Sequence, residues 1–155
     1  MNKMDDTGRL LCKYVSDLFE YSTKQKDCSS KVFVKSFVYS SIQKRINKKD
    51  FLLDSIDVPM AYSIIKNEKN MTRGKEVYPS YVMAWIGYIM KYFCYVTGIS
   101  EVTFYQKIKP EDLYKMYEAY HSLDNDLVVK RLSEDKNINI ELNNVELLKR
   151  IYGNI

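Results

Sequence analysis

The chain contains one histidine, His121, and an imidazole is the side chain best suited to acid–base chemistry at neutral pH. His121 lies three residues before Asp124, in the stretch Tyr-His-Ser-Leu-Asp. General-base catalysis needs a positioned partner and a substrate site, and no second histidine or acid-rich pocket sequence accompanies this pair. We therefore expect His121 to cap the carbonyl end of a helix and to meet Asp124, and we assign no catalytic residue.

The three cysteines, Cys12, Cys28 and Cys94, are the other candidate nucleophiles. They are far apart and form no Cys-x-x-C pair, so neither a disulfide scaffold nor a zinc cluster is indicated. The sequence also lacks a phosphate-binding loop, a dinucleotide-binding glycine pattern, a nucleophile elbow and a His-Glu-x-x-His motif. We expect a protein that is not an enzyme, with no cofactor and no metal, in the reducing cytoplasm; the alternative is an enzyme centred on His121.

Two features bear on targeting and membranes. The N-terminus carries Asp5 and Asp6, where a signal peptide requires basic residues followed by a long apolar run. Residues 81–99 contain a single charge, Lys91, and nearly reach the length of about 20 residues that spans a bilayer. Because Lys91 lies at the centre, where a charge costs about 2.5–3.5 kcal/mol, we expect a buried helix and no membrane contact.

The formal charge of +4 is unevenly distributed. From Lys24 to Lys49 the chain carries eight basic residues against one acid, Asp27, whereas residues 111–126 are mainly acidic. A basic face can bind phosphates, so one interpretation is a nucleic-acid-binding regulator that uses the basic segment 24–49. The candidate contacts are Lys31, Lys35, Lys44, Arg45, Lys48 and Lys49. No nucleic-acid-binding motif accompanies them, and a solvated basic face is the simpler interpretation.

The elements that must position these residues are all helical. The 155 residues include only five Gly and three Pro, and apolar residues recur at helical spacing. We predict an all-α fold, a single compact domain over residues 1–155 around a buried central helix at about 79–97. Helix starts are predicted at Thr7, Ser29 or Ser30, Asp57 to Pro59, Pro79, Ser100, Pro110 and Asp124, and Gly98 fits a C-terminal cap.

Two segments are less regular. Residues 67–76 are polar, contain Gly74, and read as a flexible loop, the only plausible hinge. Ile138, Ile140 and Leu142 alternate like a strand, and residues 145–152 return to helical spacing. A lone strand has no partner, so we expect this segment not to form one.

Tyrosine is unusually frequent, with 14 residues against one tryptophan. Nine tyrosines crowd one third of the chain: Tyr78, Tyr81, Tyr88, Tyr92, Tyr95, Tyr105, Tyr114, Tyr117 and Tyr120. Tyrosine combines a large rigid surface with a polar tip, which suits binding surfaces. At helical spacing it more often lies at the edge of a core, and we expect only the outermost phenols at an interface.

Part of this region resembles a known family. The shared motifs are Trp-Ile-Gly-Tyr at 85–88, Thr-Gly-Ile-Ser at 97–100 and Tyr-His-Ser-Leu-Asp at 120–124. They resemble a family of small helical proteins of Gram-positive bacteria and their mobile elements, over roughly residues 29–132. The chain has Lys-Tyr-Phe at 91–93 where the family has Arg-Tyr-Trp. The motif residues in this chain are Trp85, Gly87, Tyr88, Tyr92, Tyr120, His121 and Asp124.

The resemblance implies an intracellular bacterial protein, antitoxin-like or regulatory, from a toxin or defence operon. It brings no catalytic residues. Gly87 supports a packing role for the motif, because a glycine inside a helix costs about 1 kcal/mol against alanine and lets a second helix approach. We predict a non-catalytic protein-interaction module whose partner is another protein, such as a toxin, or a second copy of the chain.

Overall fold

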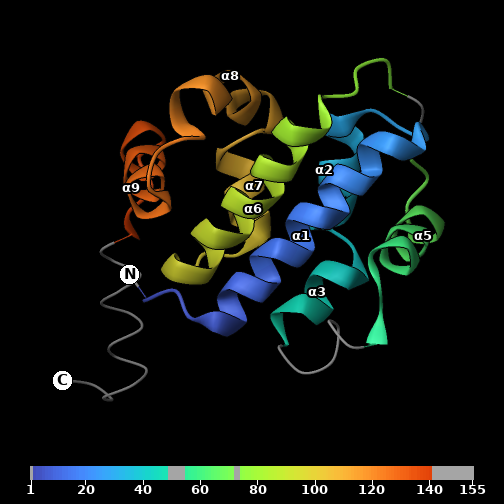
Figure 1. The fold of residues 1–155 in the computed structure, drawn as a ribbon, viewed down its shortest axis with the longest axis horizontal. Helices are drawn as coiled ribbons and strands as arrows, with labels where there is room; N and C mark the ends of the chain where they lie inside the picture. Colours follow the sequence, from blue (N-terminus) through green and yellow to red (C-terminus); the bar gives the residue numbers. More distant parts are fainter. Residues whose placement is uncertain (1, 49–54, 72–73, 141–155) are drawn as a thin grey trace.

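The computed structural model describes residues 2–48, 55–71 and 74–140. Within these ranges the chain forms eight helices and no strand (Figure 1), so the predicted all-α class is confirmed. The helices are α1 (Asp6–Gln25), α2 (Ser30–Val38), α3 (Ser41–Asn47), α5 (Val58–Glu68), α6 (Ser80–Thr97), α7 (Glu101–Lys107), α8 (Pro110–Tyr120) and α9 (Asn125–Asp135).

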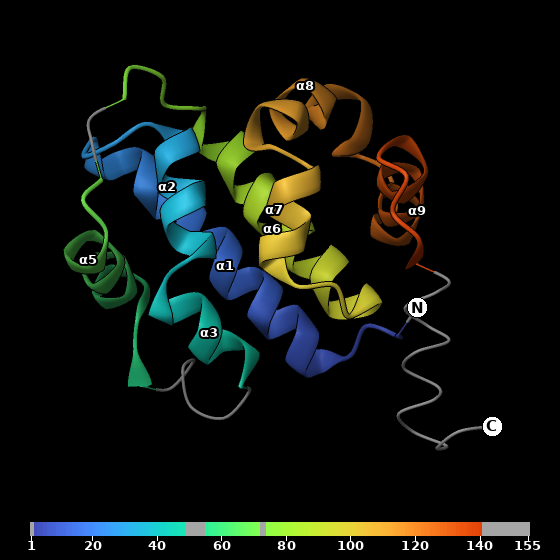
Figure 2. The same ribbon diagram turned by 180° about the vertical axis from the view of Figure 1, so that it is seen from behind.

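Helices α1 and α6 form the centre of the fold, and the predicted central helix corresponds to α6. The two helices are antiparallel, because Gly8 near the start of α1 lies against Tyr95 near the end of α6. Further along, the Ser16 hydroxyl donates to the carbonyl of Ala84 at 2.8 Å. Helices α2 and α5 pack on α1, and α7, α8 and α9 pack on α6 (Figures 1 and 2).

The two central helices approach each other closely at Gly87. A Cβ atom at this position would lie 2.8 Å from Cγ of Phe19 and 2.9 Å from the carbonyl oxygen of Val15. The Phe19 ring is itself held edge-on between Phe33 and Phe37 of α2, so it has little room to move. The missing side chain therefore allows α1 to approach α6.

Local capping explains where most helices begin. Side chains of Ser29, Asp57, Ser100 and Asp124 accept hydrogen bonds from backbone N–H groups in the first turns of α2, α5, α7 and α9. Gly98 ends α6 in the left-handed region at φ 77°, as predicted. The first helix begins earlier than predicted, because Asp5 rather than Thr7 is its N-cap.

The spacing of apolar residues from Val34 to Ile42, with Lys31, Lys35 and Arg45 on the opposite face, predicts one amphipathic helix that starts at Ser29 or Ser30, and this prediction is wrong. The segment divides into α2 and α3, because the Ser40 side chain accepts from the Gln43 N–H and starts a new helix. The chain turns between them, with the Ser40 hydroxyl and N–H both donating to the carbonyl of Phe37. Basic residues on the two helices therefore do not share one helix face.

The nearly continuous apolar sequence of α6 predicts a helix that is buried on every side, but the structure leaves one side of α6 partly exposed. Tyr81 is 60% exposed, and Trp85, Tyr88 and Tyr95 are only partly buried. These residues recur at intervals of three, four and seven, so they form one stripe along the helix. The stripe leaves aromatic rings at the surface.

The remaining predictions concern the loops and the C-terminus. The predicted loop 67–76 starts after Glu68, since α5 continues to that residue, and positions 72–73 lie outside the described residues. Ile138 forms no strand; its N–H donates to the carbonyl of Ser133 at the end of α9. Leu142 and the helical spacing of 145–152 lie outside the described residues.

Among the described residues, we find no single helix whose length and apolar character would take it across a membrane. Helices α6 and α7 meet those requirements only as a pair, and they are bent by 117° at their junction.

Candidate functional site

A group of aromatic rings lies between α6 and α8, and we call it the α6–α8 aromatic surface: Tyr81, Trp85, Tyr117 and His121. The Tyr117 ring is central, with centroid distances of 5.5 Å to Tyr81 and 5.7 Å to Trp85. The His121 ring stacks on Tyr117 at 4.3 Å with an angle of 9° between the planes. Four rings from two helices thus form one continuous group.

Helical spacing and the packing of α6 against α8 bring these rings together. Tyr81 and Trp85 are four residues apart on α6, and Tyr117 and His121 are four apart at the end of α8, so each pair lies on one face. Tyr81 and His121 are exposed, whereas Trp85 and Tyr117 are partly buried and pack on the core. The surface therefore has a fixed base and accessible outer rings.

His121 occupies a helix-end position close to the predicted one. Its Nδ1 lies 2.8 Å from the carbonyl oxygen of Tyr117, one turn earlier in the chain. The hydrogen bonds of the described residues do not include one between His121 and Asp124; Asp124 is the N-cap of α9 and accepts from the N–H of Asp126 at 2.9 Å. His121 therefore contacts the end of α8, whereas Asp124 caps the start of α9.

The other motif residues pack or tie helices together. Tyr92 is buried, and its hydroxyl donates to a carboxylate oxygen of Asp126 at 2.7 Å, which joins α6 to α9. Burial, followed by this hydrogen bond, raises the pKa of Tyr92 above its usual value. Tyr88 packs beside Tyr92 at a centroid distance of 6.3 Å, and Tyr120 is partly buried against the core. These contacts are structural.

The thiols are poor nucleophiles in this fold, because all three are buried. Burial raises the pKa of Cys12 to about 12 and that of Cys28 to about 11. The pKa of Cys94 is also raised well above its usual value by burial. A thiolate at neutral pH is therefore strongly disfavoured at each position. Within the part of the chain that the structure describes, no group of three or more His, Cys, Asp or Glu side chains could hold a metal ion.

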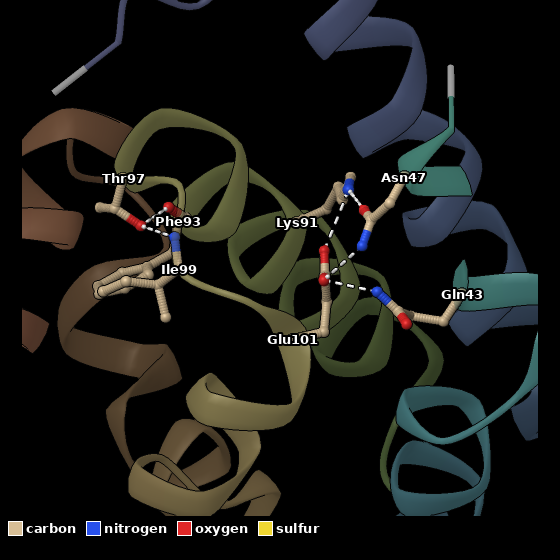
Figure 3. Close-up of polar contacts among 7 residues, drawn as sticks. All are labelled: Gln43, Asn47, Lys91, Phe93, Thr97, Ile99 and Glu101. Atoms are coloured by element: carbon tan, nitrogen blue, oxygen red, sulfur yellow. Dashed lines mark hydrogen bonds and ion pairs between the residues drawn. The ribbon is translucent and has the colours of Figure 1, made fainter. Parts of the chain in front are cut away.

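No polar partner for Lys91 was predicted from the sequence. In the structure its ammonium group belongs to a network of hydrogen-bonded polar side chains (Figure 3). Lys91 is 5% exposed, and its Nζ donates to Oε1 of Glu101 at 3.0 Å and to Oδ1 of Asn47 at 2.8 Å. The other carboxylate oxygen of Glu101 accepts from Gln43 at 2.6 Å and from Asn47 at 3.2 Å. Side chains from α3, α6 and α7 therefore satisfy one another.

The turn after α6 positions Glu101 for this network. The Thr97 hydroxyl donates to the carbonyl of Phe93 at 2.6 Å and accepts from the N–H of Ile99 at 3.2 Å (Figure 3). With Gly98 in the left-handed region and Ser100 as N-cap, Glu101 becomes the first residue of α7. A cavity of about 670 Å³ opens beside the network. Since Glu101 is 2% exposed and both its oxygens have partners, the network is built to hold helices together.

The candidate basic residues that the structure describes are all exposed. Lys31 and Lys35 lie on α2, Lys44 and Arg45 lie on α3, and Lys48 follows α3. Lys49 lies outside the described residues. The five described residues come from two helices, α2 and α3, and the turn that contains Ser40 lies between these helices.

Lys35 lies near several residues that were not predicted from the sequence as part of a site. It lines a hollow of about 480 Å³ together with Tyr39, Lys69 and Asn70. Tyr39 in turn contacts Tyr105, and Lys109 lies over the Tyr105 ring. The spacing of Lys35 and Tyr39 by four residues was visible in the sequence, whereas their closeness to α5 and α7 depends on the fold.

No family model matches the chain, and neither a curated protein nor a solved structure is similar to it at a significant level.

Proposed function

We propose that the chain is a non-catalytic, intracellular protein-interaction module whose binding face is the α6–α8 aromatic surface. The observation that carries the proposal is the continuous contact of Tyr81, Trp85 and His121 with the Tyr117 ring, in which the Tyr81 ring is exposed. The resemblance of the same segments to a bacterial family adds a regulatory, antitoxin-like role in a toxin or defence operon, in the cytoplasm.

Energetics support a binding role for this surface. Tyrosine and tryptophan are enriched among residues that dominate binding energy, because they cover a large area with few rotatable bonds. Contacts with Tyr117 already order the Tyr81 and Trp85 rings, so binding requires little further loss of side-chain freedom. A partner can cover Tyr81, which is 60% exposed, while Trp85 and Tyr117 provide the base beneath it.

The chemistry of the potential catalytic groups supports the same proposal. His121 uses Nδ1 in a hydrogen bond with the carbonyl of Tyr117, and its ring is stacked on that residue. Burial keeps the thiols protonated, and Lys91 and Glu101 neutralise each other inside the fold. A binding role uses the surface without requiring any of these groups to react.

Site-specific photo-crosslinking in the cells that produce the protein tests the proposal. A benzophenone amino acid replaces Tyr81, and a matched variant carries it at Met60, which is 50% exposed on α5. We expect a discrete protein adduct from position 81 that is absent from position 60. Adducts of this chain with itself would identify a second copy as the partner. Equal crosslinking at both positions, or none at 81, contradicts the proposal.

A further inference from the structure

A second surface combines basic and aromatic side chains, and we call it the basic–aromatic surface: Lys35, Tyr39, Lys69, Tyr105 and Lys109. These residues come from α2, the end of α5, α7 and the start of α8. Figure 2 shows α2 between α5 and α7, so the surface runs across three neighbouring elements. It is distinct from the α6–α8 aromatic surface, and it shares none of its residues.

Helix α2 supplies the middle of the surface. Lys31, Lys35 and Tyr39 follow one another at intervals of four residues, which places them on one exposed face. Across the hollow from Lys35, the chain leaving α5 contributes Lys69 and Asn70. Two lysines from different elements, Lys35 and Lys69, therefore line this hollow of about 480 Å³.

The aromatic part lies at the other side of Tyr39. Its ring is 38% exposed and meets Tyr105 edge-on, with a centroid distance of 6.2 Å and an angle of 82°. The Lys109 ammonium lies 4.2 Å from the centre of the Tyr105 ring. The rings of Tyr39 and Tyr105 therefore contact each other, with Lys35 near Tyr39 and Lys109 over Tyr105.

The three lysines of this surface outnumber the two acids close to it, Glu68 and Glu111. One of them, Glu68, lines the hollow; its carboxylate accepts hydrogen bonds from the N–H and the hydroxyl of Ser41 and lies close enough to Lys69 to interact with it electrostatically. Lysines elsewhere form ion pairs, such as Lys13 with Asp17 and Lys24 with Glu20. Within the described part of the chain, Lys35, Lys69 and Lys109 form none. Glu111 is the acid close enough to Tyr105 to act on it electrostatically.

We propose that the basic–aromatic surface binds single-stranded nucleic acid, with phosphates at Lys35, Lys69 and Lys109 and bases against Tyr39 and Tyr105. Unpaired bases present their faces to aromatic side chains, and lysines along the groove follow the backbone. In a duplex the base faces are already stacked, so the two tyrosines favour a single strand. The inference does not depend on the proposed protein-interaction function.

Fluorescence anisotropy with labelled strands of about 20 nucleotides, at about 50 mM salt, tests the proposal. The probes are single-stranded DNA and RNA of mixed sequence and the matching DNA duplex. We expect the single strands to bind more tightly than the duplex. Tyr39→Phe keeps the stacking face and retains the affinity within about twofold, whereas Tyr39→Leu weakens it about tenfold. Glu111→Gln strengthens binding by removing a nearby negative charge.

Matched charge changes locate the phosphate contacts. The triple variant Lys35→Gln, Lys69→Gln, Lys109→Gln lowers the slope of log affinity against log salt by about 2, at about 0.7 per phosphate contact on a single strand. Lys13→Gln with Lys24→Gln removes two charges on α1, and Lys44→Gln with Lys48→Gln removes two at α3. Both double variants leave the affinity within about threefold.

Three results would overturn the proposal: no single strand binds at low salt, the duplex binds as tightly as the single strands, or the α3 variant weakens binding as much as the triple variant. Melting temperatures confirm that each variant is folded. Tyr81→Ala should leave strand binding unchanged, so failure of this inference is distinguishable from failure of the proposed protein interface.

Discussion

At the scale of single residues, Lys91 shows how a charge is accommodated inside this fold. An ion transferred from water to a protein interior loses several kcal/mol of hydration, which is recovered only with an opposite charge and complete hydrogen bonding. Glu101 provides the charge, and Asn47 bonds to both members of the pair. Breaking such a pair by removing one member is more harmful than removing both, because the survivor stays buried and uncompensated.

Lys91→Met is therefore expected to lower the free energy of unfolding by about 3–5 kcal/mol. The matched control is Lys13→Met, since Lys13 pairs with Asp17 at the exposed surface and its loss should cost less than about 1 kcal/mol. Urea denaturation provides the measurement. Adding Glu101→Gln to Lys91→Met should restore part of the stability, and a double variant as unstable as the sum of the single variants would contradict the coupling.

His121 provides a second test at this scale. Asn keeps a polar group that can donate to the carbonyl of Tyr117, whereas Leu leaves that helix-end carbonyl without its side-chain partner. We expect His121→Leu to cost about 1 kcal/mol and His121→Asn clearly less, as followed by thermal melting. Both variants are also tested in the photo-crosslinking experiment at position 81. A His121→Asn protein with normal melting and no adduct would show that partner binding needs the imidazole itself, beyond its contact with the end of α8.

At the scale of secondary-structure elements, the fold depends on how closely α1 and α6 approach. Gly87 is placed where a side chain would meet both a backbone carbonyl and a ring held by other rings. Backbone cannot move aside as a flexible side chain can, so the helices would have to separate. The closeness of this crossing also fixes the stripe of α6 that carries Tyr81 and Trp85 to the surface.

Gly87→Ala is accordingly expected to destabilise the protein by about 1–3 kcal/mol, in spite of the gain of about 1 kcal/mol that alanine brings to an isolated helix. Ser63→Ala, at an exposed position of α5, is the control and should be neutral or slightly stabilising. The two melting curves are compared directly. Equal stability of wild type and Gly87→Ala would show that the crossing is looser than the structure gives.

At the scale of the whole molecule, the core contains several groups that ionise only at alkaline pH. Burial raises the pKa of Cys28 from 9.0 to about 11 and that of Cys12 from 9.0 to about 12. It also raises the pKa of Tyr14 from 10.0 to about 12. In the unfolded chain these groups lose their protons at the lower values, so the folded state binds more protons above pH 9.

Stability should therefore be insensitive to these groups below about pH 9 and should fall as the pH rises from 9 towards 11 and 12. Urea unfolding at a series of pH values measures this fall. Cys28→Ala removes one of the groups and should make the decrease between pH 9 and 11 less steep than in the wild type. A wild-type stability that is constant from pH 8 to 11 would contradict the expected linkage.

The helical fold class and most of the helix starts could be predicted from the amino-acid sequence alone. Asp57 and Asp124 cap helices because each side chain satisfies a backbone N–H two or three residues away, and Gly98 ends α6 because it adopts a left-handed conformation without strain. Such signals operate over a few residues, so they can be read from the chain. The same reading failed at Ser40, where a local cap divides what periodicity presented as one helix.

Contacts between side chains of different helices could be seen only in the tertiary structure. Lys91 donates to Asn47, and Tyr39 packs against Tyr105, although the members of each pair are far apart in the sequence. The residues between them do not predict these contacts. Periodicity shows that a helix has an apolar face, but not which neighbour covers it, and so the exposed stripe of α6 could not be foreseen. The physical reason is that capping is a local balance of hydrogen bonds, whereas the surfaces depend on the packing of all helices at once.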